Sequence, residues 1–383
     1  MVLKDIKKCS GCYACKNTCP QDCIELVYNE EGFWYPQIDE SKCLKCKLCE
    51  KICPINMGLG NLTTNPLAFM MKNNDDTVRQ NSSSGGIFSL ISEEIIKRNG
   101  VVFGAAFTND FKAVHHIAIN DINDLYMLRG SKYLQSRIGD SYKLAKEYLE
   151  QGKYVLFSGT PCQIGGLKAF LQKDYERLVT QDIICHGVPS PLVWKKYVEH
   201  LEKTSGASVS NISFRSKVTG WKSFSMAVDF TNNKKIEQPF YENIYMRGFL
   251  TNLYLRPSCY DCHFKSVYRE SDITLADFWG IEKISTEFDD DKGTSLVFIN
   301  SLKGKMFLEM LDKRISYYAT SLEEAIKYNP SAVESSKPHA RRNYFFSVWQ
   351  KHNIIYSIKK ALGISKTKYL KKICKKVIRI MKG

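Results

Sequence analysis

Long hydrophobic runs and an apolar leader are both missing from the chain. No stretch approaches the length of apolar sequence that a membrane-spanning helix needs, which argues against an integral membrane protein. The first residues, MVLKDIKKC, contain charged residues and a cysteine at the position where a secretory signal would have its apolar region. We therefore expect a cytoplasmic protein, in which 14 cysteines indicate metal or redox chemistry and not a disulfide framework.

Acidic residues are missing from the C-terminal segment, residues 335–383, which carries 14 Lys or Arg and no Asp or Glu. Nearly all of the net charge of +15 resides there, and the rest of the chain is close to neutral. This distribution argues against a nucleic-acid-binding protein, because the basic residues neither cover the fold nor accompany an RNA-recognition motif. The stretch KYLKKICKKVIRIMKG (368–383) predicts an amphipathic helix. Such a helix binds an anionic membrane surface, here at the inner face, or packs on the body or on an acidic partner.

Nine of the 14 cysteines lie in the first 53 residues, and eight of them form two copies of one spacing. The first copy is Cys9-x2-Cys12-x2-Cys15-x3-Cys19-Pro20, and the second is Cys43-x2-Cys46-x2-Cys49-x3-Cys53-Pro54. The pattern resembles that of bacterial two-cluster ferredoxins, in which three close thiolates bind one [4Fe–4S] cluster and the fourth cysteine binds the other. We assign one cluster to Cys9, Cys12, Cys15 and Cys53, and the other to Cys43, Cys46, Cys49 and Cys19.

Zinc is the alternative for these cysteines, since thiolates also suit zinc. A structural zinc ion takes four ligands, however, and not eight in two interlocked sets. Cys23 lies outside the pattern and is expected to be a packed small residue. A ferredoxin module carries electrons without a substrate of its own, so the rest of the chain is expected to consume or supply them.

The rest of the chain alternates between helical and strand patterns after a linker rich in Gly, Asn, Thr and Pro at 57–66. Strands are expected at 101–107, 154–159, 178–185 and 272–280, and helices within 77–100, 121–130, 139–152 and 191–203 and from about Ile164. The alternation predicts an α/β body with a parallel or mixed sheet. We expect three parts: a two-[4Fe–4S] ferredoxin domain at 1–57, an oxidoreductase body at 67–310 and a basic helical tail at 335–383.

Four of the five remaining cysteines lie where a cofactor could be bound. Cys162 and Cys185 each follow an apolar strand, and the carboxyl ends of parallel strands share the sheet edge where ligands collect. Cys259 and Cys262 form a Cys-x2-Cys pair, a spacing used by iron–sulfur clusters and by zinc. The four could bind a third [4Fe–4S] cluster, or Cys162 and Cys185 could be buried core residues. The Cys-x2-Cys pair favours the cluster. No ligand role is expected for Cys374.

Several stretches resemble the beta subunit of coenzyme F420-reducing hydrogenase and its flavin-dependent dehydrogenase and reductase relatives. They are SSSGG (82–86), GSKYLQS (130–136), SGTPCQIGGL (158–167), DIICHGVPSP (182–191) and CYDCHFK…SDITLADFWG (259–280). The resemblance implies FAD beside a [4Fe–4S] cluster on the four body cysteines, with coenzyme F420 or another two-electron partner docking at the flavin. Ala276 stands where members of the family often have Gly, and its methyl group would narrow a pocket there.

A flavin has some support from the residues themselves, because a helix N-terminus with close backbone approach can bind a phosphate. The candidate flavin-binding residues are Ser83, Ser84, Gly85 and Gly86, with Ser131, Lys132, Tyr133, Asp277 and Trp279. His186 is the candidate for proton transfer to a flavin or substrate. The structural alternatives are an ordinary N-cap at 82–86, a hydrogen-bonded crevice histidine and a core tryptophan.

The sequence thus predicts an iron–sulfur flavoprotein oxidoreductase. Electrons would move between the ferredoxin clusters, a third cluster and a flavin that exchanges two electrons or a hydride with coenzyme F420 or another small substrate. A redox partner protein or a small-molecule donor or acceptor is implied. The alternative is an electron-transfer adaptor that serves a partner protein and has no small-molecule substrate.

Overall fold

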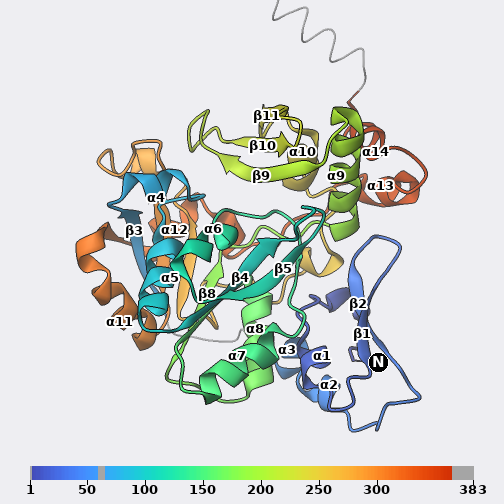
Figure 1. Ribbon diagram of the computed structural model, residues 1–383, viewed down its shortest axis with the longest axis horizontal. Coiled ribbons are helices and arrows are strands. Elements are labelled where there is room, and N and C mark those ends of the chain that lie inside the picture. Colours follow the sequence, from blue (N-terminus) through green and yellow to red (C-terminus); the bar gives the residue numbers. More distant parts are fainter. Residues whose placement is uncertain (1, 59–64, 365–383) are drawn as a thin grey trace, which may run out of the picture.

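The computed structural model describes residues 2–58 and 65–364. The amphipathic helix expected over 368–383, with Cys374, lies outside the described residues. The chain forms a cysteine-rich N-terminal module, a large sheet with helices on both faces, and a small three-stranded sheet (Figure 1). No helix within the described ranges is long and apolar enough to cross a membrane.

The N-terminal module contains one hairpin, three short α-helices and one 3-10 helix, Ile6–Lys8. Strands β1 (Ile24–Tyr28) and β2 (Trp34–Ile38) pair antiparallel, and helices α1 (Ala14–Thr18), α2 (Leu48–Lys51) and α3 (Pro54–Met57) lie beside the cysteines.

The sequence repeat of the module is also a backbone repeat. In each copy, the residues immediately before and after the second cysteine have left-handed backbone angles. In the first copy Gly11 has φ +68° and Tyr13 has φ +70°, and in the second copy Lys45 has φ +55° and Lys47 has φ +60°. Three of these residues are not glycine, for which this conformation is uncommon. Both cysteine segments therefore have the same backbone conformation around their second cysteine.

The large sheet has nine strands in the order β14-β3-β13-β12-β8-β7-β4-β5-β6. Their bounds are β3 (Leu67–Asn73), β4 (Val101–Phe107), β5 (Val114–Ile119), β6 (Ser136–Arg137), β7 (Val155–Ser158), β8 (Leu178–Ile183), β12 (Ile273–Asp277), β13 (Ser295–Ile299) and β14 (Ile315–Thr320). Strands β12, β8, β7 and β4 are mutually parallel, and antiparallel strands extend the sheet on both sides. The predicted mixed α/β sheet is confirmed.

Helices cover both faces of this sheet. On one face, α5 (Ile87–Lys97), α6 (Leu125–Leu128) and α11 (Leu302–Met310) share an apolar core with the strands. On the other face, α7 (Ser141–Glu150) and α8 (Pro161–Leu171) do the same, and Tyr13 and Trp34 of the N-terminal module join that core. The short helices α4 (Asp76–Gln80) and α12 (Leu322–Lys327) contact β3. The module is thus packed against the α7–α8 layer, and α1 and α3 contact α8 directly.

A second layer lies over one end of the large sheet (Figure 1). It contains the antiparallel strands β9 (Val209–Ser216), β10 (Ser225–Phe230) and β11 (Lys235–Pro239) and the helices α9 (Pro191–Ser205), α10 (Ile244–Leu250), α13 (Arg342–Val348) and α14 (Ile354–Ala361). These elements share one core around Trp194, Phe214 and Tyr245. The Arg342 guanidinium bonds the Glu31 carboxylate at 2.7 and 2.5 Å, which ties α13 to the loop between β1 and β2.

The expected strands at 101–107, 154–159, 178–185 and 272–280 correspond to β4, β7, β8 and β12. The helix expected from about Ile164 begins three residues earlier, at Pro161. Thr160 and Gln163 form a capping box, and proline suits the first helical position. Cys162 consequently lies in the first turn of α8, and Cys185 lies in the loop after β8.

Candidate functional site

The four body cysteines meet at the carboxyl edge of the parallel strands. Cys162, Cys185, Cys259 and Cys262 all line one cavity of about 40 Å³. Burial raises the pKa of Cys162, Cys185 and Cys262, and raises that of Cys259 to about 12. A thiolate is therefore disfavoured at this position unless a cationic centre is bound to it.

The surroundings of these cysteines suit an anionic cluster. Lys265 and Arg269 line the same cavity, and the Lys265 ammonium donates to the carbonyl oxygens of Cys185 and Ser331. Val188 N donates to Cys259 Sγ at 3.4 Å, the type of bond that stabilises a thiolate. Among the described residues, no three His, Cys, Asp or Glu side chains converge on a site for a single metal ion. The four thiols instead surround a common space, and this donor set fits a four-iron cluster.

The N-terminal cysteines divide into the two expected sets by location. Cys9, Cys12, Cys15 and Cys53 line a cavity of about 20 Å³ on the side of the module that faces the body. Of the other set, Cys46 is exposed and Cys19, Cys43 and Cys49 are half-buried. Cys23 is buried, and its Sγ lies 3.3 Å from Cys19 Sγ. One cluster site is thus internal, and the other lies at the surface.

The internal site is fixed by a buried arginine of the body. Arg256 has no exposed surface, and it donates from Nε to the carbonyl oxygen of Cys9 at 2.7 Å. It also donates to the carbonyl oxygen of Trp34 and to Gln135 Oε1, both at 3.0 Å. Because Gln135 Nε2 donates in turn to the carbonyl oxygen of Ser10, the cysteine loop is held from two directions.

Helix α8 lies in contact with both cysteine sites. Its Cys162 lines the body cavity, and a side chain at Gly166 would place Cβ 2.9 Å from Cys12 Cβ. Ser10 and Ile55 line both the 20 Å³ cavity and the 40 Å³ cavity. The two sites are therefore direct neighbours.

A third and much larger cavity opens next to the body cysteines. Its volume is about 620 Å³, within the range of small-molecule and cofactor sites. It lies between the carboxyl edge of the large sheet and the small sheet, and Cys162, Cys185 and His186 line both this cavity and the 40 Å³ cavity. The large pocket and the four-cysteine site therefore share a wall.

Eight of the nine candidate flavin-binding residues line this pocket, namely Ser83, Ser84, Gly86, Ser131, Lys132, Tyr133, Asp277 and Trp279. Ala276 lines it as well, so the methyl group does reduce the space at that position. Gly85 is the exception, because it is packed between β3 and β13. A Cβ there would lie 2.5 Å from the carbonyl oxygen of Met71. The role of Gly85 is close packing that positions the neighbouring serines.

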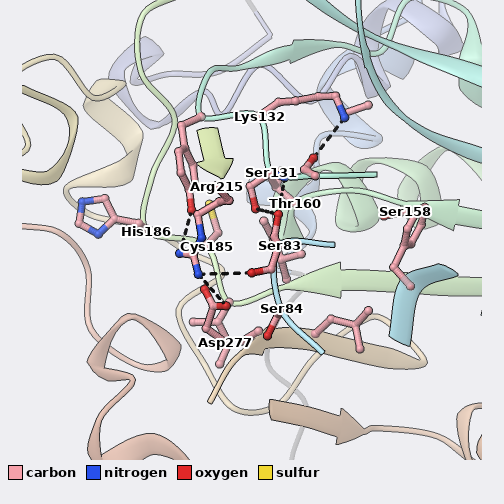
Figure 2. A pocket seen from close by; sticks show the side chains of 18 of the residues that line it. Ser83, Ser84, Ser131, Lys132, Ser158, Thr160, Cys185, His186, Arg215 and Asp277 are labelled. Atoms are coloured by element: carbon pink, nitrogen blue, oxygen red, sulfur yellow. Dashed lines mark hydrogen bonds and ion pairs between the residues drawn. The ribbon is translucent and has the colours of Figure 1, made fainter. Parts of the chain in front are cut away.

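One end of the pocket is suited to an anion. Figure 2 shows Ser83 beside Ser131, whose backbone N donates to Ser83 Oγ at 2.7 Å. Gly86, with φ +82°, caps the eleven-residue helix α5, and the first turn of α5 faces the same space. The Lys132 ammonium lies among the carbonyl oxygens of residues 128–130, and burial lowers its pKa to about 7.

Asp277 has a partner that was not predicted. Arg215 of β9 donates to Asp277 Oδ1 at 3.0 Å, as Figure 2 shows, and Trp221 Nε1 donates to the same oxygen at 2.9 Å. The guanidinium lies over the rings of Phe224 and Trp279. The large sheet and the small sheet are thereby joined across the pocket. The spacing of residues along the chain gave no signal for this pair, since 62 positions separate the two side chains.

His186 is hydrogen-bonded, as the structural alternative expected. Its Nε2 lies 2.6 Å from Asn252 Oδ1, and its ring packs edge-on against Phe249. Burial lowers the pKa of His186, so the ring is neutral near pH 7. An amide oxygen only accepts, which leaves the proton on Nε2. His116, to which the sequence gave no role, also lines the pocket and bonds Ser136 and the carbonyl oxygen of Ser158.

Two protein-family models match the chain. One describes the C terminus of the beta subunit of coenzyme F420 hydrogenase/dehydrogenase and matches residues 152–325, and the other, a 4Fe-4S dicluster domain, matches residues 8–57. The chain thus contains, at residues 152–325, a domain of the coenzyme F420 hydrogenase/dehydrogenase beta-subunit family. It carries a two-[4Fe–4S] ferredoxin domain ahead of the family domain, and the predicted family is confirmed.

Shorter matches and one structural match accompany these models. An uncharacterized ferredoxin of Methanocaldococcus jannaschii is 34% identical over 55 residues, covering 14% of this chain and 70% of that protein. A ferredoxin-like protein of the nif region in Azotobacter vinelandii is 36% identical over 61 residues, covering 14% and 61%. A chain of the F420-reducing [NiFe] hydrogenase complex from Methanosarcina barkeri matches with a TM-score of 0.46 at 17% identity, covering 80% of this chain and 94% of that chain.

Proposed function

We propose that this protein is an iron–sulfur flavoprotein that passes electrons between three [4Fe–4S] clusters and a flavin. The two ferredoxin clusters would be held by the N-terminal cysteines, and a third [4Fe–4S] cluster by Cys162, Cys185, Cys259 and Cys262. A flavin, FAD in the first instance, would occupy the 620 Å³ pocket. There it would exchange two electrons or a hydride with coenzyme F420 or another small molecule.

The observation that carries this proposal is the continuity of the three cavities. Ser10 and Ile55 separate the internal ferredoxin site from the four-cysteine site, and Cys162 and Cys185 separate the latter from the pocket. No long gap interrupts the route from the module to the pocket. When bound, a flavin supplies the conversion between one-electron and two-electron transfer, which side chains cannot perform.

The residues of the pocket have separable roles in this proposal. Lys132, the serines near it and the α5 N-terminus would hold the pyrophosphate. Arg215 and Asp277 join the two sheets across the pocket that the flavin would occupy. His186 lies between the cysteine site and the pocket, where it would position the cofactor through its neutral ring or relay a proton at Nδ1.

Iron and flavin content per chain test the proposal, after anaerobic purification and reconstitution of the full chain. We expect about twelve irons, from three four-iron clusters, and one flavin. A Cys162→Ser variant should lose about four irons and keep the spectrum of the ferredoxin clusters.

A content of about eight irons without flavin would overturn the proposal. In that case Cys162 would be a buried core residue. The alternative function, an electron-transfer adaptor that serves a partner protein without a small-molecule substrate, would be favoured.

A further inference from the structure

The two halves of the ferredoxin domain share a backbone and differ in the residues that cover it. Around the second cysteine of each copy, Ser10, Gly11, Tyr13 and Ala14 correspond to Leu44, Lys45, Lys47 and Leu48. In the first half these positions pack on the body: Tyr13 and Ala14 are buried, and a Cβ on Gly11 would meet Gln135 and Arg256. In the second half Leu44 is 65% exposed and Leu48 is 39% exposed. One half is built for burial, and the other half exposes apolar side chains to solvent.

Lysines surround these exposed leucines. Residues 41–51 contain Lys42, Lys45, Lys47 and Lys51, all exposed, and a single acid, Glu50. The whole domain, residues 1–57, has eight Lys and eight Asp or Glu, so this positive charge is local and is not a property of the domain. Exposed Cys46 lies within the same segment, so a cysteine of the second set is next to these lysines in the chain.

The location of this segment leaves it free to meet another molecule. Helix α2 lies at the outer end of the module in Figure 1, away from the small sheet, whereas α1 and α3 contact α8. The internal cluster site already contacts the body, whereas the second site borders solvent. An electron that enters or leaves the described part of the chain through the module therefore reaches solvent most directly at this segment.

We infer that Leu44, Lys45, Lys47, Leu48 and Lys51, here called the lysine face, form the docking surface for a small acidic electron-carrier protein. An acidic iron–sulfur or flavin protein complements the local charge, and its apolar centre would cover the two leucines. One electron passes from the carrier, which is oxidised, to the second cluster, which is reduced, and no bond or proton moves. The inference goes beyond the proposed function: it requires the two-cluster domain and is independent of the flavin.

The test measures electron transfer from a plant-type [2Fe–2S] ferredoxin, an acidic protein, to the reconstituted full chain. The ferredoxin is reduced, freed of excess reductant and mixed anaerobically in a stopped-flow instrument at a series of ionic strengths. The variants are Lys45→Gln/Lys47→Gln, Lys45→Glu/Lys47→Glu and Leu44→Ser, the last copying the residue of the buried half. The matched control is Lys235→Glu/Lys305→Glu, which changes the same number of exposed lysines on the small sheet and on α11.

At low ionic strength we expect the second-order rate constant to fall about threefold for the double Gln variant and about tenfold or more for the double Glu variant. These differences should shrink as salt screens the charges, and the control should match the wild type. Iron content and cluster potentials, measured on each variant, separate docking from damage to the cluster. Oxidation of the reduced chain by cytochrome c, a basic acceptor, should become faster in the Glu variant.

Equal rates with the acidic ferredoxin for the wild type and the Glu variant at every ionic strength would overturn the inference. A rate loss that does not respond to salt, and that follows a shifted cluster potential, would also overturn it. Because the readout is reduction of the ferredoxin-domain clusters, a chain that lacks flavin can still give either result.

Discussion

The ammonium group of Lys132 gives the large pocket a pH-dependent charge. In the ligand-free chain, burial lowers its pKa to about 7, whereas the pKa of His116 nearby is lowered to about 4. Between pH 6 and 9 the lysine therefore loses its proton and the histidine stays neutral. A bound pyrophosphate raises the pKa of the lysine, so binding takes up a proton and weakens as the pH rises.

We accordingly predict that the affinity for FAD is nearly constant below pH 7 and declines above it, approaching about tenfold for each pH unit. Lys132→Met should bind FAD more weakly at pH 6 and show a flat profile to pH 9. Equilibrium dialysis or fluorescence titration against FAD, whose pyrophosphate stays ionised over this range, measures both curves. An unchanged slope in Lys132→Met would exclude this lysine as the group that titrates.

Single residues also show where sequence interpretation succeeds and where it ends. The positions of Cys162 and Cys185 after strands predicted that these two thiols share one sheet edge, because parallel strands share a carboxyl edge. The spacing left open whether the Cys259 and Cys262 pair joins them, and the structure brings all four to one cavity. The Arg215–Asp277 pair could not be predicted in this way. It joins two sheets whose relative position depends on packing around Trp194 and not on any local pattern.

Among the elements, α8 has the most demanding environment, since two consecutive glycines face different cysteine sites. A Cβ on Gly166 would lie 2.8 Å from Tyr142 Oη and 2.9 Å from Cys12 Cβ. A Cβ on Gly165 would lie 2.6 Å from Phe264 Cε1, two residues beyond Cys262. These distances are too short for an added methyl group, so a neighbour must move in each case.

The variants Gly166→Ala and Gly165→Ala can therefore be compared directly, and each is the control for the other. We expect Gly166→Ala to disturb the cluster at Cys12, and Gly165→Ala to disturb the site at Cys262. In both, overpacking of about 1–3 kcal/mol outweighs the gain of up to about 1 kcal/mol in helix propensity. Iron content, low-temperature electron paramagnetic resonance and urea unfolding separate the two outcomes. Identical spectra in both variants would contradict the assignment of α8 to two sites.

The start of α8 illustrates how far an element can be predicted. Its existence follows from the apolar pattern, but its first turn is set by side-chain to backbone bonds of Thr160 and Gln163 and by the fixed φ of Pro161. The strands β13 and β14, which lie on either side of β3, were not predicted individually. They are short apolar runs whose partner, β3, lies more than 200 residues earlier in the chain.

At the scale of the whole molecule, the four-cysteine site lies between the internal ferredoxin site and the large pocket. This order predicts the effect of removing the four-cysteine site. In Cys259→Ser/Cys262→Ser the ferredoxin clusters should still be reduced at the wild-type rate, whereas reduction of bound flavin through them should become slow. Iron content should fall by about four per chain. Stopped-flow absorbance follows both centres, and Cys374→Ser is the control, since no ligand role is expected for that cysteine. Rapid flavin reduction in the double variant would show that electrons bypass the four-cysteine site.

The bonds of Arg256 limit how this chain can be recombined with others. Its buried guanidinium is held by carbonyl oxygens of Cys9 and Trp34, on the ferredoxin side, and by Gln135 of the body. A chimaera with a foreign ferredoxin domain would keep the arginine and lose acceptors for it, and an uncompensated buried charge costs about 3–5 kcal/mol. Domain exchange should therefore succeed only with donors that present two carbonyl oxygens at this point. The ferredoxin domain and the body would therefore be inherited as one unit.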